Sequence, residues 1–160
     1  MALDLIAELE GLIDAFDRDG IEYALCGGIA LGVHGYVRAT RDIDMLVPAE
    51  QLDRALVTAK ACGFDVPGRK MVFGLKAGTP REIHRVSKLD PDTGELMPLD
   101  LMAVAHEYVS VWADRTKVLW RQRNLAVVSR EGLATMKRLA GRPQDLADLA
   151  KLEGNDDDET

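Results

Sequence analysis

Two aspartates at alternate positions, Asp42 and Asp44, are the residues whose types and spacing most clearly suggest chemistry. They begin an apolar run that continues to Val47, so the segment is expected to form a strand. Alternate side chains of a strand point to the same face, so the two carboxylates would project together. Neighbouring carboxylates repel each other unless a cation lies between them. The pair therefore suggests a Mg²⁺ site beside a phosphate.

A glycine pair and a third aspartate extend this pattern. Gly27 and Gly28 precede a short helical stretch, where backbone N–H groups could approach a phosphate without obstruction by side chains. Asp100 lies in an apolar run, where its charge would be costly to bury without a cation. Nucleotide transfer from an NTP uses two Mg²⁺ ions roughly 3.5–4 Å apart. We expect Asp42 and Asp44 to share these ions and Asp100 to bind the ion that activates the nucleophile.

Each of these residues also has a simpler interpretation. Asp42 and Asp44 alone would fit a solvated strand end, and Asp100 could be paired with a nearby arginine. Arg38 and Arg41 could steer phosphates, or either could form an ion pair with Asp42. The glycines before the pair and the third carboxylate after it favour the metal site.

The bulk composition is that of an ordinary folded protein. The 160 residues are 47% hydrophobic and 29% charged, which predicts one domain over 1–153 and a disordered acidic tail over 154–160. No apolar stretch is long enough to cross a bilayer, and the N-terminal segment lacks a signal-peptide pattern, so no membrane partner is expected. Cys26 and Cys62 form no CxxC motif, so we expect buried thiols in a reducing, cytoplasmic compartment.

The net charge of −7 is unevenly distributed. Residues 153–160 contain five acids and no base, whereas residues 115–142 contain eight basic residues. The acidity therefore lies mostly in the tail, and a polyanionic partner such as RNA is compatible with the composition.

Hydrophobic periodicity and turn residues predict the elements that hold these groups. Helices and strands are mixed around a small sheet, which indicates an α/β or α+β class. A turn is expected at 90–94, and Ser129 is expected to cap a helix. The expected helices are 3–18, 28–34, Pro48 to about Gly63, Ser129 to about Ala140 and 143–152, and the expected strands are 23–26, 43–47, 71–75, 82–86, 96–102, 116–120 and 125–128.

Two segments of the chain resemble a known family. The run from Gly27 to Val47, with its glycine pair, short helix and Asp-x-Asp, resembles the signature of the polymerase-beta-type nucleotidyltransferase superfamily. The run from Met136 to Leu149 resembles the closing motif of one branch, the AbiEii-type toxin-like nucleotidyltransferases. The resemblance implies a minimal nucleotidyltransferase fold with a mixed β-sheet flanked by helices. It also implies a two-Mg²⁺ mechanism with an NTP as donor and the three aspartates as metal ligands.

The family motifs imply roles for further residues. Lys137 would neutralise the triphosphate, and Asp145 and Asp148 would help to position Lys137 or the acceptor. Without the resemblance, Lys137 would fit a solvated helix face, and the two aspartates would fit a favourable interaction with the helix dipole. Many relatives carry serine at the second glycine position, whereas Gly28 offers a phosphate only its backbone N–H.

The expected activity is transfer of a nucleoside monophosphate from an NTP to a hydroxyl acceptor. If the AbiEii resemblance extends to function, the acceptor is an RNA end or a protein, and the chain is the toxin of a toxin–antitoxin pair with a cognate antitoxin. A small-molecule acceptor, as in antibiotic-modifying relatives, is the enzymatic alternative, and the basic stretch 115–142 mildly favours RNA. An alternative that is not an enzyme is a catalytically inactive module of the same fold that senses nucleotides or binds a protein. Retention of three carboxylates argues against it, because an inactive copy has no chemical need for crowded like charges.

Overall fold

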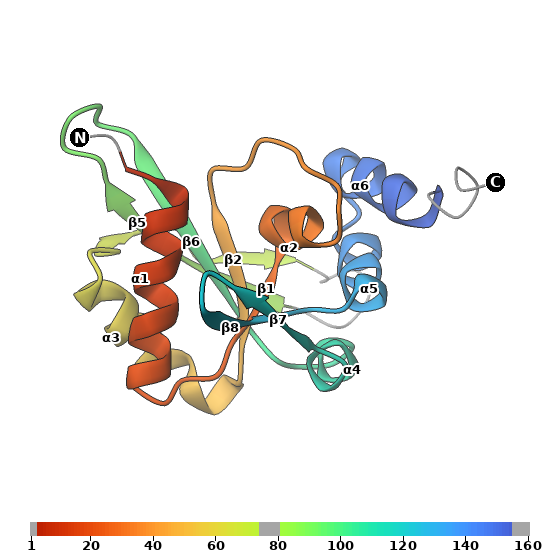
Figure 1. Ribbon diagram of the computed structural model, residues 1–160, viewed down its shortest axis with the longest axis horizontal. Coiled ribbons are helices and arrows are strands. Elements are labelled where there is room, and N and C mark those ends of the chain that lie inside the picture. The colour runs from red at the N-terminus through yellow and green to blue at the C-terminus, as the bar shows by residue number, and fades with distance from the viewer. Residues whose placement is uncertain (1–2, 74–80, 155–160) are drawn as a thin grey trace.

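In the computed structural model, which describes residues 3–73 and 81–154, eight strands form one mixed β-sheet with helices on both faces (Figure 1). This arrangement confirms the predicted class. The strands are β1 (Ala24–Cys26), β2 (Ile43–Val47), β3 (Val66–Pro67), β4 (Met71–Phe73), β5 (Arg81–Leu89), β6 (Leu96–Ala103), β7 (Thr116–Trp120) and β8 (Arg123–Val127).

The order of the strands places β2 and β6 side by side in the middle of the sheet. The order is β3-β5-β6-β2-β1-β8-β7, and β4 pairs with β5. β2 is parallel to β6 but antiparallel to β1, and β1 is parallel to β8. The segments that carry the predicted site residues, 24–28, 43–47 and 96–103, therefore meet on adjacent strands although they are far apart in the sequence.

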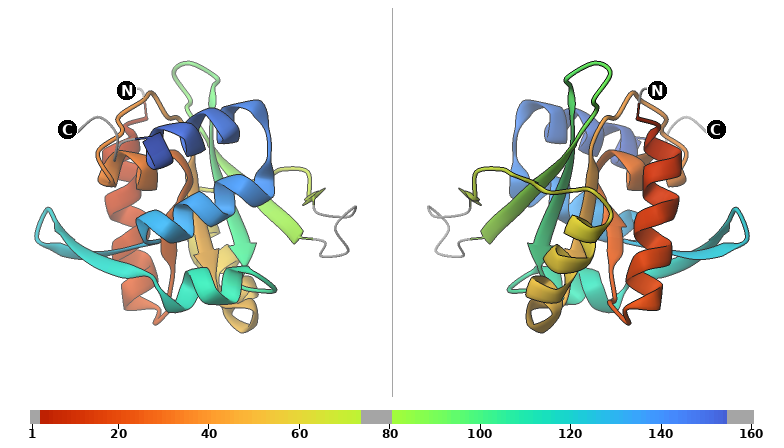
Figure 2. Two further views of the ribbon diagram at one scale, coloured as in Figure 1. Left: turned by 90° about the vertical axis from the view of Figure 1, so that its right-hand side faces the viewer. Right: turned by 90° about the vertical axis from the view of Figure 1, so that its left-hand side faces the viewer.

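Two groups of helices cover the two faces of the sheet (Figure 2). α1 and α3 lie on one face, and α2, α4, α5 and α6 lie on the other. Among the described residues, no helix combines the length and the apolar character that crossing a membrane requires. The helices are α1 (Leu5–Arg18), α2 (Gly27–Val33), the 3-10 turn η1 (Ala49–Gln51), α3 (Leu52–Ala61), α4 (Tyr108–Ala113), α5 (Arg130–Ala140) and α6 (Pro143–Gly154).

The helix ends follow from local chemistry. The Asp4 side chain caps α1 by accepting a hydrogen bond from the Ile6 amide, and Ser129 caps α5 by accepting one from the Gly132 amide. Gly141 ends α5 in the left-handed conformation, with φ of 66°, which glycine adopts without steric cost. The predicted cap and the predicted stop of this helix are both confirmed.

The structure differs from the predicted elements at a few places. The helix after Pro48 begins as a 3-10 turn, and the helix after β1 begins at Gly27. β3 and α4 were not predicted, because β3 has only two residues and α4 is a six-residue helix of mostly β-branched and aromatic residues with weak helix propensity. Of the predicted tail, Gly154 ends α6, and 155–160 lie outside the described residues, as do 74 and 75 of the predicted strand 71–75.

The two cysteines are both free thiols, as expected. Cys26 is buried at the end of β1, whereas Cys62, which we expected to be buried, is only partly so. Cys62 follows the last turn of α3, where one side of the chain faces solvent.

Replacement of the α5 cap tests how much local capping contributes to this helix. Ser129→Ala removes the hydrogen bond that Oγ accepts from the Gly132 amide and the exposed one that it donates to Asp114, so we expect the free energy of unfolding to fall by about 1–2 kcal/mol. Thr135→Ala, on the same helix but away from its end, should change the stability less. Equal effects of the two substitutions in urea denaturation would contradict a capping role for Ser129.

Candidate active site

Three carboxylates converge above the middle of the sheet. Asp44 on β2 and Asp100 on β6 are directly paired in the parallel register, so their side chains lie on the same face. Asp42 precedes β2 by one residue. Each of the three residues offers a carboxylate oxygen, and these oxygens lie within 4.8 Å of one another. The structure therefore brings together the three residues that we predicted as metal ligands.

The crowding of these acids has an electrostatic cost. Burial, followed by repulsion from Asp100 and Asp42, raises the pKa of Asp44 to about 7. A bound cation would relieve this cost, because opposite charge favours the ionised form of each carboxylate. The donor set consists of carboxylate oxygens, which are the ligands that Mg²⁺ prefers. The residues present therefore fit the metal that the family resemblance implies.

An arginine that the sequence analysis did not identify completes this cluster. Arg85 on β5 is the direct partner of Asp100 on the adjacent strand β6. It donates two hydrogen bonds to Asp100, at 2.7 Å from Nε and 2.9 Å from Nη2. A simpler interpretation of Asp100 was pairing with an arginine, and the structure shows this pairing together with the carboxylate cluster. Sequence spacing could not identify Arg85, because its position depends on the register between β5 and β6.

Positions 27 and 28 need glycine because other side chains lie where a Cβ atom would be. Gly27 has φ of 65°, and a Cβ atom there would overlap the carboxylate of Asp44. A Cβ atom at position 28 would lie 2.8 Å from Oγ1 of Thr40. The hydroxyl of Thr40 thus occupies the space beside the second glycine. Thr40 is a second residue that the sequence analysis missed.

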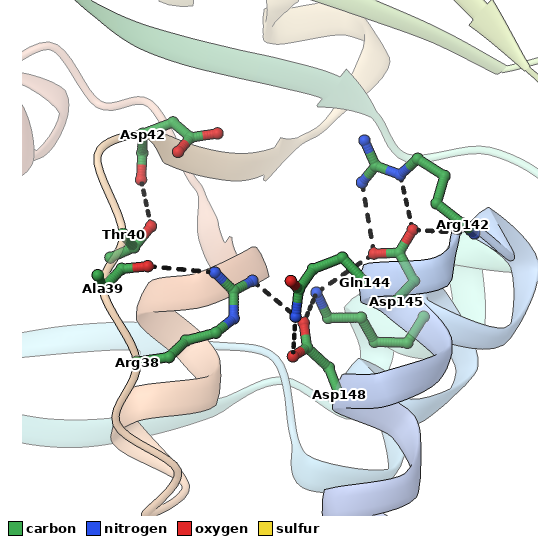
Figure 3. A network of polar contacts seen from close by, with 9 residues as sticks. Arg38, Ala39, Thr40, Asp42, Arg142, Gln144, Asp145 and Asp148 are labelled. Carbon is green, nitrogen blue, oxygen red and sulfur yellow. Dashed lines mark hydrogen bonds and ion pairs between the residues drawn. The ribbon is translucent and has the colours of Figure 1, made fainter.

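A buried ionic network links α5, α6 and the loop before β2 (Figure 3). Nζ of Lys137 lies 3.0 Å from Oδ2 of Asp148 and 3.4 Å from Oδ1 of Asp145. Nη2 of Arg38 donates to the same Oδ2 of Asp148 at 3.1 Å, and Arg142 binds Asp145 at 2.7 Å. Only 7% of the Lys137 side chain is exposed, so Lys137 does not lie on the solvated helix face of the simpler interpretation.

The central acid of this network stays ionised despite its burial. Desolvation would raise the pKa of Asp148, but hydrogen bonds from Lys137, Arg38 and Gln144 outweigh it and lower the pKa below the usual range. The loss of one partner from such a buried pair leaves an uncompensated charge, which is strongly destabilising. The network therefore holds Lys137 in place next to the carboxylate cluster.

The two predicted arginines differ in position. Arg38 lines the same cavity as the three carboxylates, whereas Arg41 pairs with Glu95 and is 79% exposed. Neither arginine shows an ion pair with Asp42 in the described part of the chain, so that alternative is wrong for this structure. Arg41 is not among the described lining residues of the cavity.

One cavity of about 600 Å³ contains most of these groups. Its lining includes the glycine pair, the three carboxylates, Arg85 and residues of the α5–α6 network, and it is formed by the sheet together with α2, α4, α5 and α6. Small-molecule sites are usually concave cavities of this size. Its described acidic and basic lining residues are Asp42, Asp44, Asp100, Asp145, Arg38, Arg85, Lys137 and Arg142.

Solved structures with a similar fold include antibiotic-modifying enzymes. The lincosamide antibiotic adenylyltransferase LnuA, solved with lincomycin bound, has a TM-score of 0.61 at 14% identity, over 96% of this chain and 98% of its own. ANT(2″)-Ia, solved in complex with adenylyl-2″-tobramycin, has a TM-score of 0.62 at 13% identity, over 92% of this chain and 86% of its own. This chain has the nucleotidyltransferase fold.

A third structure agrees with this result. An antigenic nucleotidyltransferase-like protein from Paracoccidioides brasiliensis has a TM-score of 0.53 at 19% identity, over 95% of this chain and 78% of its own. At these identities the likeness shows the fold alone, and the fold that the family resemblance implied is confirmed. No protein-family model matches the sequence, and no curated protein matches it significantly.

The contact between Gly28 and Thr40 can be tested by paired substitutions. Gly28→Ala places a methyl group against Thr40, so we expect a loss of about 1–3 kcal/mol in unfolding free energy. In a Thr40→Gly background, Gly28→Ala should cost less unfolding free energy than it does in wild type, because the clashing atoms of Thr40 are gone. Strictly additive effects in a double-mutant cycle would contradict the close approach.

The carboxylate crowding predicts a pH effect in metal-free protein. Between pH 3.8, the ordinary value, and about 7, folded Asp44 keeps a proton that the unfolded chain releases. The unfolding free energy of wild type should therefore fall as the pH rises through this window. Measured against that of Asp44→Asn, the total fall should be roughly 1–4 kcal/mol. Urea denaturation in EDTA measures this difference, with the exposed Asp53→Asn as control. A pH-independent difference between wild type and Asp44→Asn would show that Asp44 titrates normally.

Proposed function

We propose that this protein is a Mg²⁺-dependent nucleotidyltransferase that moves a nucleoside monophosphate from an NTP to a hydroxyl acceptor. The single observation that carries the proposal is the convergence of Asp42, Asp44 and Asp100 next to the turn at Gly27. Three carboxylates within 4.8 Å of one another are unfavourable without cations, and the glycine pair lines the same cavity, where its backbone could approach a phosphate.

The residues around the cluster have complementary roles in this proposal. Asp42 and Asp44 would hold both ions, and Asp100 would hold the ion on the acceptor side. When bound, Mg²⁺ would supply the positive charge that lowers the pKa of the acceptor hydroxyl and stabilises the leaving pyrophosphate. Arg85 donates one hydrogen bond to each oxygen of Asp100, and because each carboxylate oxygen has two lone-pair sites, Asp100 could bind Arg85 and a metal at the same time.

The triphosphate would lie between α2 and α5. Gly27, Gly28 and Arg38 line the cavity from the α2 side, where backbone N–H groups and the guanidinium would bind phosphate oxygens. Lys137 faces it from α5 and would neutralise phosphate charge, while Asp145 and Asp148 position it. Arg41, exposed and paired with Glu95, would at most steer the nucleotide from a distance.

The proposed reaction is a substitution at the α-phosphorus. A bond forms between the acceptor oxygen and the α-phosphorus, and the bond from the α-phosphorus to the bridging oxygen of pyrophosphate breaks. The hydroxyl proton passes to water, and pyrophosphate leaves with the bonding electrons. Neither the protein nor the metal changes its oxidation state, so the reaction needs no further reactant.

The finer proposal of a toxin with a cognate antitoxin depends on the resemblance of residues 136–149 to the AbiEii-type motif. In the structure, Lys137, Asp145 and Asp148 of this motif belong to the buried network at the cavity. This position supports a role of the motif in the site itself. The structural neighbours favour a different acceptor, because LnuA is a lincosamide antibiotic adenylyltransferase and ANT(2″)-Ia was solved with adenylyl-2″-tobramycin.

Metal-dependent nucleotide binding tests the proposal directly. We expect each bound NTP to raise the melting temperature of wild type only when Mg²⁺ is present. Asp44→Asn should lose this shift, and its rate of transfer from α-³²P-labelled NTP should fall about 100-fold or more, the scale of lost electrostatic stabilisation. Asp53→Asn, an exposed acid on α3, is the matched control and should behave as wild type.

Two results would contradict the proposal. Absence of any Mg²⁺-dependent shift with all four NTPs in wild type would exclude the proposed site. A shift without transfer to RNA, to proteins of a cell extract or to small hydroxylated molecules would favour the nucleotide-sensing alternative.

A further inference from the structure

The cavity at the carboxylate cluster has two unlike halves. On the α2 side, Gly28, Arg38 and Thr40 provide polar groups. Beyond Asp100 and Arg85 the lining becomes apolar, which a triphosphate does not need. The apolar half consists mainly of Met71, Ile83, Met102, Tyr108, Leu133 and Met136.

The register of the sheet explains the position of the apolar half. Met71, Ile83 and Met102 are successive partners across β4, β5 and β6, so they form a row on one face. Asp100 lies two residues before Met102 and therefore points to the same face. The apolar row lies directly beside the row that carries Asp100 and its partner Arg85.

Two helices add further apolar side chains to the lining of the cavity. Tyr108 from α4 and Leu133 and Met136 from α5 are at least nine-tenths buried yet line the cavity. Three of the six side chains are methionines, whose flexible thioethers adapt to apolar groups of different shape. These walls suit an apolar body rather than a charged or strongly hydrated one.

The order of the strands assigns this half to the acceptor. The glycine pair follows β1, Asp44 lies on β2 and Asp100 on β6, whereas the apolar row extends from β6 to β4. The attacking and leaving oxygens lie on opposite sides of the phosphorus in such a transfer. If the pyrophosphate leaves toward the glycine pair, the acceptor enters from the side of Asp100 and the apolar row.

The charges argue against highly charged acceptors. The described lining of the cavity has four acidic and four basic residues, so it has no excess charge of either sign. The basic stretch 115–142, which mildly favoured RNA, is largely engaged within the protein. Its ion pairs are Arg115 with Glu22, Arg121 with Glu10, Arg123 with Asp14 and with Glu10, Lys137 with Asp145 and with Asp148, Arg138 with Glu153, and Arg142 with Asp145.

We propose that the acceptor is a small uncharged molecule that carries its hydroxyl on an apolar body, and that Met71, Met102 and Met136 select it. This inference rests on the proposed nucleotidyl transfer and specifies its acceptor. An RNA would have to displace several of the internal ion pairs to gain phosphate contacts, and a polycation would meet no surplus of negative charge.

Methyl NMR of methionine-labelled protein tests the inference without relying on activity. The probe is n-hexyl β-D-glucoside, added with Mg²⁺ and a non-hydrolysable ATP analogue, and methyl β-D-glucoside is the matched probe without the apolar chain. We expect hexyl glucoside to shift the methyl signals of Met71, Met102 and Met136. Met45 and Met97 point to the opposite face of the sheet and should not shift.

A substitution adds an affinity measurement to this test. Met71→Gln, at a partly buried position, should weaken hexyl glucoside binding about tenfold through lost apolar contact. Unchanged Met45 and Met97 signals in this variant would show that the fold is intact. Unchanged affinity in such a folded variant would count against the assigned role of Met71.

The outcomes separate this inference from the proposed function. If the ATP analogue shifts the amide signals of Gly27 and Gly28 but hexyl glucoside shifts none of the three methyl signals, only the acceptor inference fails. If the analogue alone shifts the three methyl signals, the apolar half holds the nucleobase and the inference is wrong. It is also wrong if tobramycin or an RNA oligonucleotide shifts them more than hexyl glucoside. If the analogue does not bind at all, the proposed function fails.

Discussion

The structure of the site depends on like charges held together on adjacent strands. Asp44 and Asp100 are direct partners in the parallel register of β2 and β6, and Asp42 precedes β2. Because all three are acids, the surrounding chain has to leave space and supply positive charge. Gly27 has no side chain where one would overlap Asp44, and Arg85 donates two hydrogen bonds to Asp100. The raised pKa of Asp44 reflects the repulsion that stays uncompensated, and it is the physical reason to expect a cation there.

The positive groups of the cavity each have an acidic partner within the protein. Arg85 neutralises Asp100, and Lys137 is held by Asp145 and Asp148 across α5 and α6. Arg38 and Arg142 are likewise paired, with Asp148 and Asp145. This balance keeps the folded site stable, since an unpaired buried charge is costly. It also explains why the cavity shows no surplus charge that would attract a polyanion or a polycation.

Much of the fold could be predicted because its signals are local. The helical repeat of α1, the cap at Ser129 and the stop at Gly141 each depend on residues within a few positions of one another. α4 was not predicted because packing of Tyr108 and Val111, and not propensity, stabilises it. The basic stretch 115–142 was a weak guide to a partner, because the acids that neutralise Arg115, Arg121 and Arg123 come from α1 and the segment that follows it.

The sequence by itself determined the three aspartates that converge and the glycine pair beside them. A glycine pair, an alternating pair of aspartates and a third aspartate in an apolar run have a chemical meaning that does not depend on the register of the sheet. Only the tertiary structure decided which groups surround them. Arg85, Thr40 and the row from Met71 to Met102 reach the site through strand pairing and loop packing between segments that are not neighbours in the chain. Such contacts leave no periodic or motif signal, because each depends on how distant segments align.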